Sequence, residues 1–259
     1  MGSFSRGNTY RFQWRGLVPP AIKTLLIACA AVFVFKTFLE VAFQPQVVGA
    51  FFHYFGLVPF AVVHGYIWQL GTYIFLHDSI WHLLFNLLFL WMFGKDLELT
   101  WGKRKFYFYF FLCGIGAAVI NVAVKAVLAA YGIGSLVTAP TIGASGAIFG
   151  VLIAAALVFP QQQVWLIPFP VSIPMKFYVL MIGAIEFYFT LATPGDGVSH
   201  VCHLGGMLVG YLYLRRGSFL YNFRNVFTDW KRRRLRKKFE VYDRDHRDKP
   251  PSRPGNWVN

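Results

Sequence analysis

Two apolar stretches of the chain carry the residues that decide its fold. Residues 141–159 read TIGASGAIFGVLIAAALVF, and residues 199–214 read SHVCHLGGMLVGYLYL. Neither stretch contains an aspartate, glutamate, lysine or arginine. Both have the composition and the approximate length of helices that cross a bilayer. Each nevertheless carries a reactive polar side chain near its start, Ser145 in the first stretch and His203 in the second.

The composition of the whole chain indicates an integral membrane protein. Of its 259 residues, 56% are hydrophobic and only 14% are charged, whereas about 25% of residues are charged in a typical soluble domain. Because about 20 helical residues cross a hydrocarbon core, we expect an all-α polytopic protein with six transmembrane helices. The six predicted spans are approximately 22–44, 79–94, 106–130, 141–159, 174–192 and 199–214.

Lysine and arginine residues gather in alternate connections between these spans. They precede the first span, lie between the second and third, border the fourth-to-fifth connection and follow the sixth. Residues 45–67, 131–140 and 193–198 contain none. Since cytoplasmic connections are enriched in Lys and Arg, six spans with both termini in the cytoplasm satisfy every loop. No organelle-targeting extension is visible, so we expect a bacterial inner (plasma) membrane.

The charge pattern also predicts the domain organisation. Residues 1–21 form a cytoplasmic segment, residues 22–216 the membrane domain, and residues 217–259 a basic, partly disordered cytoplasmic tail. The tail holds 12 basic and 5 acidic residues, and we interpret it as a topology signal. It also rests on anionic lipid, at about 1 kcal/mol per basic residue near the surface. The net charge of +14 therefore requires no nucleic acid partner.

Four polar side chains are expected at one depth in the membrane. Polar residues inside a bilayer are costly, so each is a candidate for function. In the predicted topology the second, fourth and sixth spans all run inward from the outer face. Ser145 and His203 each lie about 6 Å below the start of a span. His82 is equally near the start of the second span, and Asn86 lies one turn deeper on the same face.

This convergence predicts a reaction. A serine hydroxyl becomes a good nucleophile when a neighbouring base removes its proton, and neutral histidine is the usual base near pH 7. His82, the Asn86 amide and backbone N–H groups near Ser145 could stabilise the oxyanion of a tetrahedral intermediate. Glycine at position 143 would let the backbone approach the substrate closely. The pattern therefore favours peptide-bond hydrolysis within the bilayer.

Three short motifs together resemble those of the rhomboid family of intramembrane serine proteases. They are His82-x-x-x-Asn86 in the second span, Gly143-x-Ser145-Gly146 in the fourth, and His203-x-x-Gly206-x-x-x-Gly210 in the sixth. The likeness covers approximately residues 60–215. It implies a rhomboid-like six-helix bundle, and an endopeptidase that cleaves single-span transmembrane proteins near the outer membrane face without a metal or another cofactor.

The resemblance also implies the roles of individual residues. Ser145 and His203 would form a catalytic dyad without a third acidic member. His82, Asn86 and Gly143 would form the oxyanion site. In the sixth span, Gly206 and Gly210 form a small-xxx-small pattern, which lets two helix backbones meet.

Other implied features lie around this site. The connection over residues 45–67 would be embedded in the outer leaflet, and the fifth span, with Phe187 and Phe189, would flank a lateral gate for substrates. Two positions depart from the family pattern. Gln69 stands where members commonly have an arginine that would brace the embedded connection. Phe149 stands where some have a tyrosine packed on the catalytic imidazole.

Three alternatives remain open at this point. His200 competes with His203 as the base, although only His203 begins the His-x-x-Gly-x-x-x-Gly pattern. A metal site is disfavoured because the chain has no His-Glu-x-x-His motif. Its candidate ligands would be His77, His82, His200, Cys202 and His203. A transporter, or a scaffold that binds transmembrane helices, would instead use Glu186 and the polar residues of the first and third spans.

Overall fold

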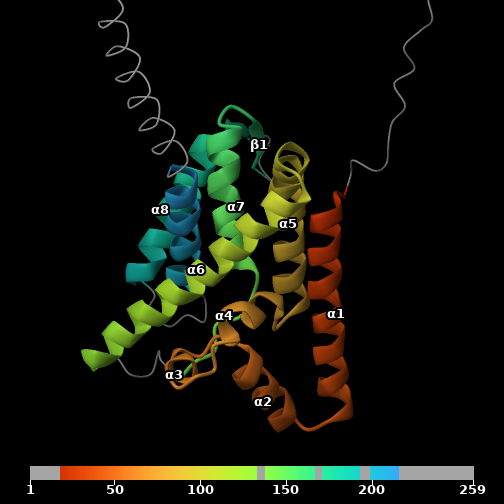
Figure 1. Cartoon of the computed structure of the whole chain (residues 1–259), viewed down its shortest axis with the longest axis vertical. Coiled ribbons are helices and arrows are strands. Elements are labelled where there is room, and N and C mark those ends of the chain that lie inside the picture. Colours follow the sequence, from red (N-terminus) through yellow and green to blue (C-terminus); the bar gives the residue numbers. More distant parts are fainter. Residues whose placement is uncertain (1–17, 133–137, 167–170, 193–198, 216–259) are drawn as a thin grey trace, which may run out of the picture. The chain divides into compact units, whose positions relative to one another are not determined.

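A computed structural model describes residues 18–132, 138–166, 171–192 and 199–215, and these parts of the chain are mostly helical (Figure 1). The helices are α1 (Pro20–Ala42), α2 (Pro45–Phe55), α3 (Pro59–Val63), α4 (Gln69–Thr72), the 3-10 helix η2 (Tyr73–Phe75), α5 (Ile80–Trp101), α6 (Lys103–Ala130), α7 (Ser145–Val158) and α8 (Met175–Ala192). A last helix covers residues 200–215. Strands β1 (Gln163–Trp165) and β2 (Ser172–Pro174) pair antiparallel, with Val164 opposite Ile173.

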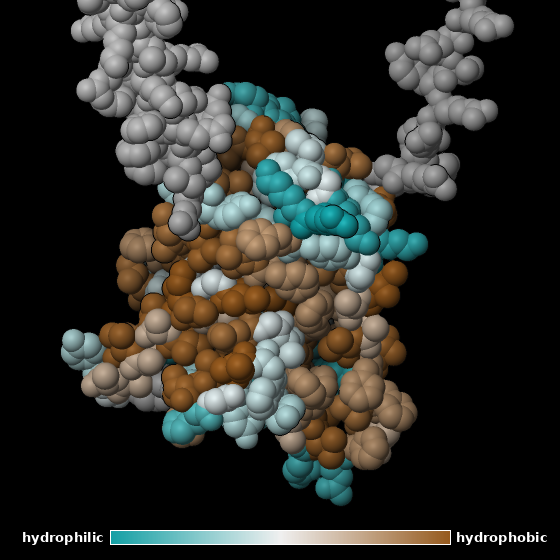
Figure 2. All heavy atoms as spheres, in the orientation of Figure 1, coloured by the Kyte–Doolittle hydropathy of each residue, from teal (hydrophilic) through white to brown (hydrophobic). Residues whose placement is uncertain are grey.

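The described helices identify an integral membrane protein. Three of them, α1, α6 and α8, are long and apolar enough to cross a membrane, and a fourth candidate arises if the α4–η2 segment and α5, which meet at a bend of 98°, form one span. Figure 2 shows hydrophobic side chains over much of the middle of the molecule and hydrophilic ones toward its ends. The described residues thus contain three or four candidate spans, and the predicted count of six is not confirmed.

Helix α7 lies at the centre of the packing. It contacts α5, α6 and α8, and its residues from Gly146 to Ala155 are mostly buried. Helix α1 packs on the far side of α5 (Figure 1). This arrangement follows from the small side chains of α7, because alanine and glycine let neighbouring helices approach closely.

Helix α5 continues beyond the predicted end of its span at residue 94 and reaches Trp101. The charged residues that suggested an earlier end are accommodated in the fold. Glu98 is buried, and its carboxylate accepts hydrogen bonds from the backbone N–H groups of Ala21 at 2.7 Å and Ile22 at 2.8 Å. These donors are at the start of α1, where a helix has unpaired N–H groups and favours a negative charge. A charge in α5 therefore caps a second helix.

Helix α7 starts later than predicted, at Ser145 instead of residue 141. Thr141 pairs with Leu57 in an isolated antiparallel bridge, and Gly143 has a φ of +112°. An extended residue and a positive φ cannot belong to an α-helix. Ser145 consequently occupies the first turn of α7, four residues after the bridge that joins Thr141 to the connection formed by α2 and α3.

Gln69 braces this connection. Its side chain is fully buried, its Oε1 accepts a hydrogen bond from the N–H of Val58 at 2.9 Å, and its Nε2 donates to the carbonyls of His53 at 2.8 Å and Tyr54 at 3.2 Å. An amide offers both acceptor and donors. The bracing that the resemblance assigned to an arginine is therefore present here through glutamine, while embedding of residues 45–67 in the outer leaflet stays a prediction.

We expect Gln69→Ala to lower the free energy of unfolding by about 1–3 kcal/mol, because it leaves buried backbone groups without partners. Thermal unfolding in detergent would measure the effect. Gln163→Ala is the matched control, since Gln163 is exposed in β1 and its loss should change the unfolding temperature little. Equal unfolding temperatures for the two variants would contradict a bracing role.

Two predicted regions lie mostly outside the described residues. Residues 1–17 and 216–259 include most of the predicted N-terminal segment and all of the predicted basic tail. The three-part division of the chain and the contact of the tail with anionic lipid therefore stay predictions.

Candidate active site

Ser145 and His203 meet across two helices. Ser145 is the first residue of α7, and His203 lies one turn into the helix of residues 200–215. The Nε2 atom of His203 is 2.7 Å from the Oγ atom of Ser145, within hydrogen-bond distance. Both residues line a cavity of about 620 Å³. A hydroxyl and an imidazole in this relation have the geometry of an activated nucleophile and its base.

The two helices that carry these residues are in backbone contact. A Cβ atom added at Gly206 would overlap the carbonyl group of Gly146, and one added at Gly210 would lie 3.2 Å from the Cα atom of Gly150. Glycine is needed at such a close crossing because any side chain would separate the backbones. The predicted small-xxx-small pattern therefore packs directly behind the Ser145–His203 pair.

Phe149 holds the ring of His203 from one side. The two rings are parallel to within 7°, with centroids 4.2 Å apart. Since Phe149 is one turn after Ser145 on α7, the same helix carries Ser145 and the ring that stacks on His203. Phenylalanine thus occupies the stacking position that the resemblance associates with tyrosine.

A carboxylate lies next to the Ser145–His203 pair. The sequence did not predict this contact. Oε2 of Glu186 in α8 is 2.8 Å from Nδ1 of His203 and 2.6 Å from Nδ1 of His200. A carboxylate only accepts hydrogen bonds, so each Nδ1 carries the hydrogen. The resemblance implied a dyad without a third acidic member. That expectation stays a prediction, although the structure places the carboxylate of Glu186 beside His203. His200, the competing base, reaches Glu186, whereas His203 reaches Ser145.

Among the residues that the structure describes, Glu186, His200 and His203 have ligand atoms close enough together to suggest a metal site. These atoms of Glu186, His200 and His203 lie within 4.8 Å of one another. Zinc would stand about 2.0–2.2 Å from each ligand atom and would separate the ligands beyond hydrogen-bond contact. The Nδ1–Oε2 distances of 2.6 and 2.8 Å instead correspond to hydrogen bonds, so the donors are used within the cluster.

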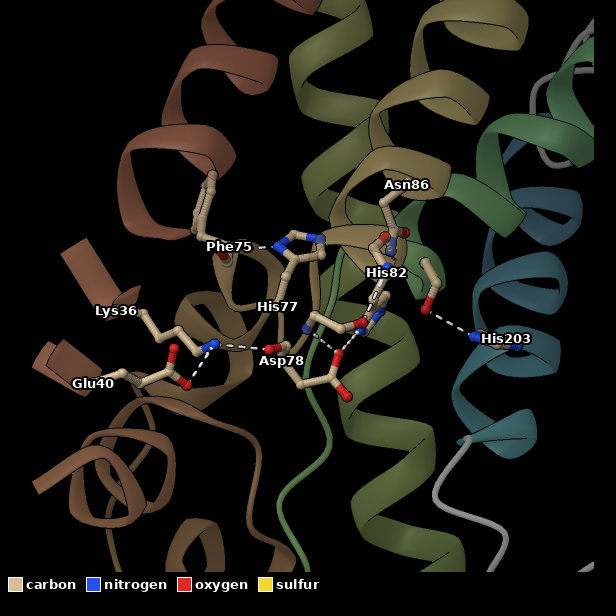
Figure 3. A network of polar contacts seen from close by, with 10 residues as sticks. Lys36, Glu40, Phe75, His77, Asp78, His82, Asn86 and His203 are labelled. Atoms are coloured by element: carbon tan, nitrogen blue, oxygen red, sulfur yellow. Dashed lines mark hydrogen bonds and ion pairs between the residues drawn. The ribbon is translucent and has the colours of Figure 1, made fainter. Parts of the chain in front are cut away.

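His82 and Asn86 lie on the other side of Ser145. Nδ1 of His82 is 2.7 Å from Oδ1 of Asp78, and its Nε2 faces Gly143, where an added Cβ would lie 2.6 Å from it. The Asn86 amide donates to the carbonyl of His82 at 2.9 Å, which uses one of its two hydrogens. Figure 3 shows both side chains on α5, with His203 on a helix across from them. They line the same cavity.

Gly143 contributes in a different way from the one predicted. Its N–H group donates to the carbonyl of Tyr73 at 2.9 Å, so it is not available as an oxyanion donor. Its φ of +112° is in the region that favours glycine. The position therefore makes room for His82 beside Ser145 and does not itself bind the oxyanion.

Lys36 of α1 supports the segment before α5. Its Nζ atom donates to the carbonyl of Asp78 at 2.7 Å and pairs with Glu40 at 2.7 Å, as Figure 3 shows. Lys36 and Glu40 are four residues apart in α1, a spacing at which side chains on one helix face meet. Lys36 is 4% exposed, and it anchors the residue whose carboxylate contacts His82.

The predicted gate residues lie beside the cavity and not in its wall. The cavity is lined by Phe85 and Phe89 from α5 and by Ile182 and Glu186 from α8. Phe187 is 59% exposed. Phe189 stacks on His200 with centroids 5.5 Å apart. Of the described residues, Phe89 and Ile182 therefore line the cavity, whereas the predicted gate residues do not.

Residues 64–217 match the family model described as the Rhomboid domain. The chain belongs to the rhomboid family. It is 30% identical over 140 residues to "Rhomboid protein 1, mitochondrial" of Saccharomyces cerevisiae, covering 54% of this chain and 38% of that protein. It is 29% identical over 150 residues to "Rhomboid protease GluP" of Bacillus subtilis, covering 58% of this chain and 26% of that protein.

A third rhomboid relative is "Presenilin-associated rhomboid-like protein, mitochondrial" of Mus musculus. It is 28% identical over 151 residues, which cover 56% of this chain and 37% of that protein. The matched part thus spans between about a quarter and two fifths of the three relatives. Two of them are named as mitochondrial, so the comparisons do not support the bacterial inner membrane expected from the sequence.

Sequence reasoning missed two acidic residues of this rhomboid site, and a signal existed for each. Asp78 precedes His82 by four residues, a spacing that lets side chains meet at the start of a helix. Glu186 lies six residues before the end of α8, and His203 three residues after the start of its helix. Since 1.5 Å per residue separates helical positions, the two residues have similar depths in adjacent helices.

Proposed function

We propose that this rhomboid protein is an intramembrane serine endopeptidase that cleaves single-span transmembrane proteins near the outer membrane face. The observation that carries the proposal is the 2.7 Å contact between Ser145 Oγ and His203 Nε2 in a shared cavity. Membership of a family that includes a named rhomboid protease supports it. No cofactor is needed, because nucleophile, base and oxyanion donors are all side-chain or backbone groups.

The reaction proceeds in two halves. Ser145 Oγ attacks the scissile carbonyl while its proton moves to Nε2 of His203, and the carbon–nitrogen bond then breaks as that proton passes to the leaving amine. Water attacks the resulting ester by the reverse route and releases the second product. The second hydrogen of the Asn86 amide and backbone N–H groups in the first turn of α7 stabilise the oxyanion. His82, whose Nδ1 donates to Asp78, adds a donor at Nε2 when its ring is an imidazolium, in which both nitrogens donate.

The substrate must expose a peptide bond that a helix normally protects. A transmembrane helix satisfies all its backbone hydrogen bonds internally, so it has to unwind before its carbonyl reaches Ser145. Substrates with glycine, proline or other small residues near the outer boundary are therefore favoured. We propose that they enter between α5 and α8, past the cavity-lining residues Phe89 and Ile182 and the neighbouring Phe187 and Phe189.

The membrane arrangement that fits this reaction has six spans. These are α1, α5, α6, α7, α8 and the helix of residues 200–215, with both termini in the cytoplasm and the basic tail on anionic lipid. The distribution of Lys and Arg supports this orientation.

A reagent that reacts with activated serines tests the proposal. A fluorophosphonate should label the purified protein in detergent, and mass spectrometry should find the label on Ser145. Ser79 and Ser199 line the same cavity and serve as internal controls, because neither should be labelled. A folded protein without label at Ser145 would contradict the proposal and favour a scaffold or transporter, which has no reason to activate a serine.

We expect Asp78→Ala to lower kcat by about 10- to 100-fold, because the imidazole of His82 loses the partner that fixes its orientation. KM for a transmembrane reporter should change little. Asp96→Ala is the matched control, since Asp96 lies near the other end of α5, where it accepts a hydrogen bond from Gln162. Equal kcat values for the two variants would exclude a role of Asp78 in positioning His82.

A further inference from the structure

The proposed mechanism assigns no role to Glu186, a mostly buried acidic residue. It belongs to α8, and its side chain is 14% exposed. It faces two histidines of the neighbouring helix, both of which are also mostly buried. We propose that Glu186 is a positioning residue that extends the Ser145–His203 pair into a serine–histidine–glutamate triad, held in place by His200. This inference rests on the proposed function of Ser145 and His203.

The contacts arrange the three groups in the order that a triad requires. Ser145 Oγ is 2.7 Å from Nε2 of His203, and the opposite ring nitrogen, Nδ1, is 2.8 Å from Oε2 of Glu186. Since the carboxylate accepts from Nδ1–H, the neutral ring has its lone pair on Nε2. Nε2 can therefore accept the proton of Ser145. The carboxylate selects the tautomer that makes His203 a base.

His200 and two aromatic rings immobilise this carboxylate. Nδ1 of His200 is 2.6 Å from the same Oε2 atom, so Glu186 receives two charge-assisted hydrogen bonds, which are stronger than neutral ones. Phe149 stacks on His203 and Phe189 stacks on His200. The cluster thus has rings against both imidazoles. A carboxylate held in this way does not have to reorient during the reaction.

The triad changes the energy of the proton transfer and leaves its stoichiometry unchanged. As the Oγ–carbon bond forms, the Ser145 proton moves to Nε2, and His203 becomes an imidazolium ion. Glu186 keeps the Nδ1 hydrogen bond and remains ionised, so the positive ring lies beside a negative oxygen. Because both side chains are mostly buried, this attraction stabilises the charged intermediate more than it would at a surface. The Nε2 proton then passes to the leaving amine.

Other titratable groups surround His203 and are included in the test. Asp78 and His82 of α5 line the same cavity, Lys125 of α6 donates to Thr141 in its wall, and His200 lies on the same helix. These groups are present in every variant of Glu186. A difference in pH dependence between wild type and such a variant therefore reports on Glu186.

We expect Glu186→Gln to lower kcat by about 10²–10⁴-fold with KM changed by less than about 3-fold. The glutamine amide can donate to Nδ1 and place the hydrogen on Nε2, where it blocks the serine proton. The labelling rate of Ser145 by a fluorophosphonate should fall in parallel. The pH dependence of kcat/KM should also shift, because the imidazolium loses its anionic partner. A merely structural glutamate would produce neither the parallel loss nor the shift.

Glu98→Gln is the matched control, because Glu98 is a buried carboxylate that caps α1 far from the cavity lining. It should lower the unfolding temperature and leave kcat and the pH profile unchanged. Glu186→Asp keeps the charge but draws it away from His203, so it should retain the wild-type pH profile with a kcat between those of wild type and Glu186→Gln. If Glu186→Gln does not fold, the kcat of Glu186→Asp tests the triad instead. A wild-type kcat in Glu186→Asp would overturn the triad.

The outcomes separate the triad from the proposed function. Wild-type protein that is labelled at Ser145 and cleaves the reporter, together with Glu186→Gln at similar kcat and an unchanged pH profile, would overturn the triad alone. Wild-type protein that is folded and neither labelled nor active would overturn the proposed function, and the triad with it.

Discussion

Ser145→Ala and His203→Ala are each expected to lower cleavage of a transmembrane reporter by about 10⁴-fold or more. Without the hydroxyl no acyl-enzyme can form, and without the imidazole the hydroxyl stays protonated. The reporter should carry a glycine-rich outer boundary and be reconstituted with the protein in liposomes. Mass spectrometry of the products would map the cleaved bond, which we expect near the outer membrane edge.

Two controls make this result specific. Ser172→Ala and His64→Ala remove the same side-chain types from β2 and from the segment that follows α3, and both variants should cleave at the wild-type rate. The double variant Ser145→Ala/His203→Ala should be no slower than either single one, because residues that act as a unit are not additive. Cleavage of the same bond by the Ser145→Ala variant would contradict the mechanism.

The helices were largely predictable from the sequence, and their ends were not. Hydropathy located α1, α6 and α8 to within a few residues, because a long apolar run has few alternatives to a membrane span. The extension of α5 to Trp101 depends on Glu98, which becomes tolerable through two N–H groups on α1. The start of α7 depends on Gly143 and on the bridge between Thr141 and Leu57. Such partners are distant in the chain, so local patterns cannot reveal them.

The candidate site was also predictable only in part, for the same reason. Motifs and equal depth brought Ser145 and His203 together, since both belong to helices that were expected to run in one direction. Glu186 belongs to α8, which was expected to run the opposite way, so its distance from the start of a span does not place it at the depth of Ser145 and His203. Only the tertiary structure shows that Glu186 belongs to the site, because its carboxylate lies 2.8 Å from His203. Similarly, the hydrogen bond from Gly143 to Tyr73 removed a donor that the motif alone suggested.

The crossing of α7 with the helix of residues 200–215 predicts a large effect on both stability and activity. Gly206→Ala would place a methyl group against the carbonyl group of Gly146, where backbone and not a movable side chain must give way. Overpacking of this kind costs about 1–3 kcal/mol. Because the two helices also carry Ser145 and His203, a separation of about 1 Å should lower kcat by about 10²-fold.

Three glycine-to-alanine variants form a graded test of this crossing. At Gly205 an added Cβ would lie 3.2 Å from a side-chain atom of Ile120 and 3.3 Å from the Cα atom of Ala117, so the neighbours would have to move by a few tenths of an ångström. At Gly49 in α2 nothing lies within 4 Å. The unfolding temperature and the rate of reporter cleavage should therefore be lowest in Gly206→Ala and intermediate in Gly205→Ala. Gly49→Ala should be stabilised by up to about 1 kcal/mol, because alanine favours a helix over glycine. Wild-type stability and activity in Gly206→Ala would mean that the helices do not cross at this position, and the contact between Ser145 and His203 would then need another support.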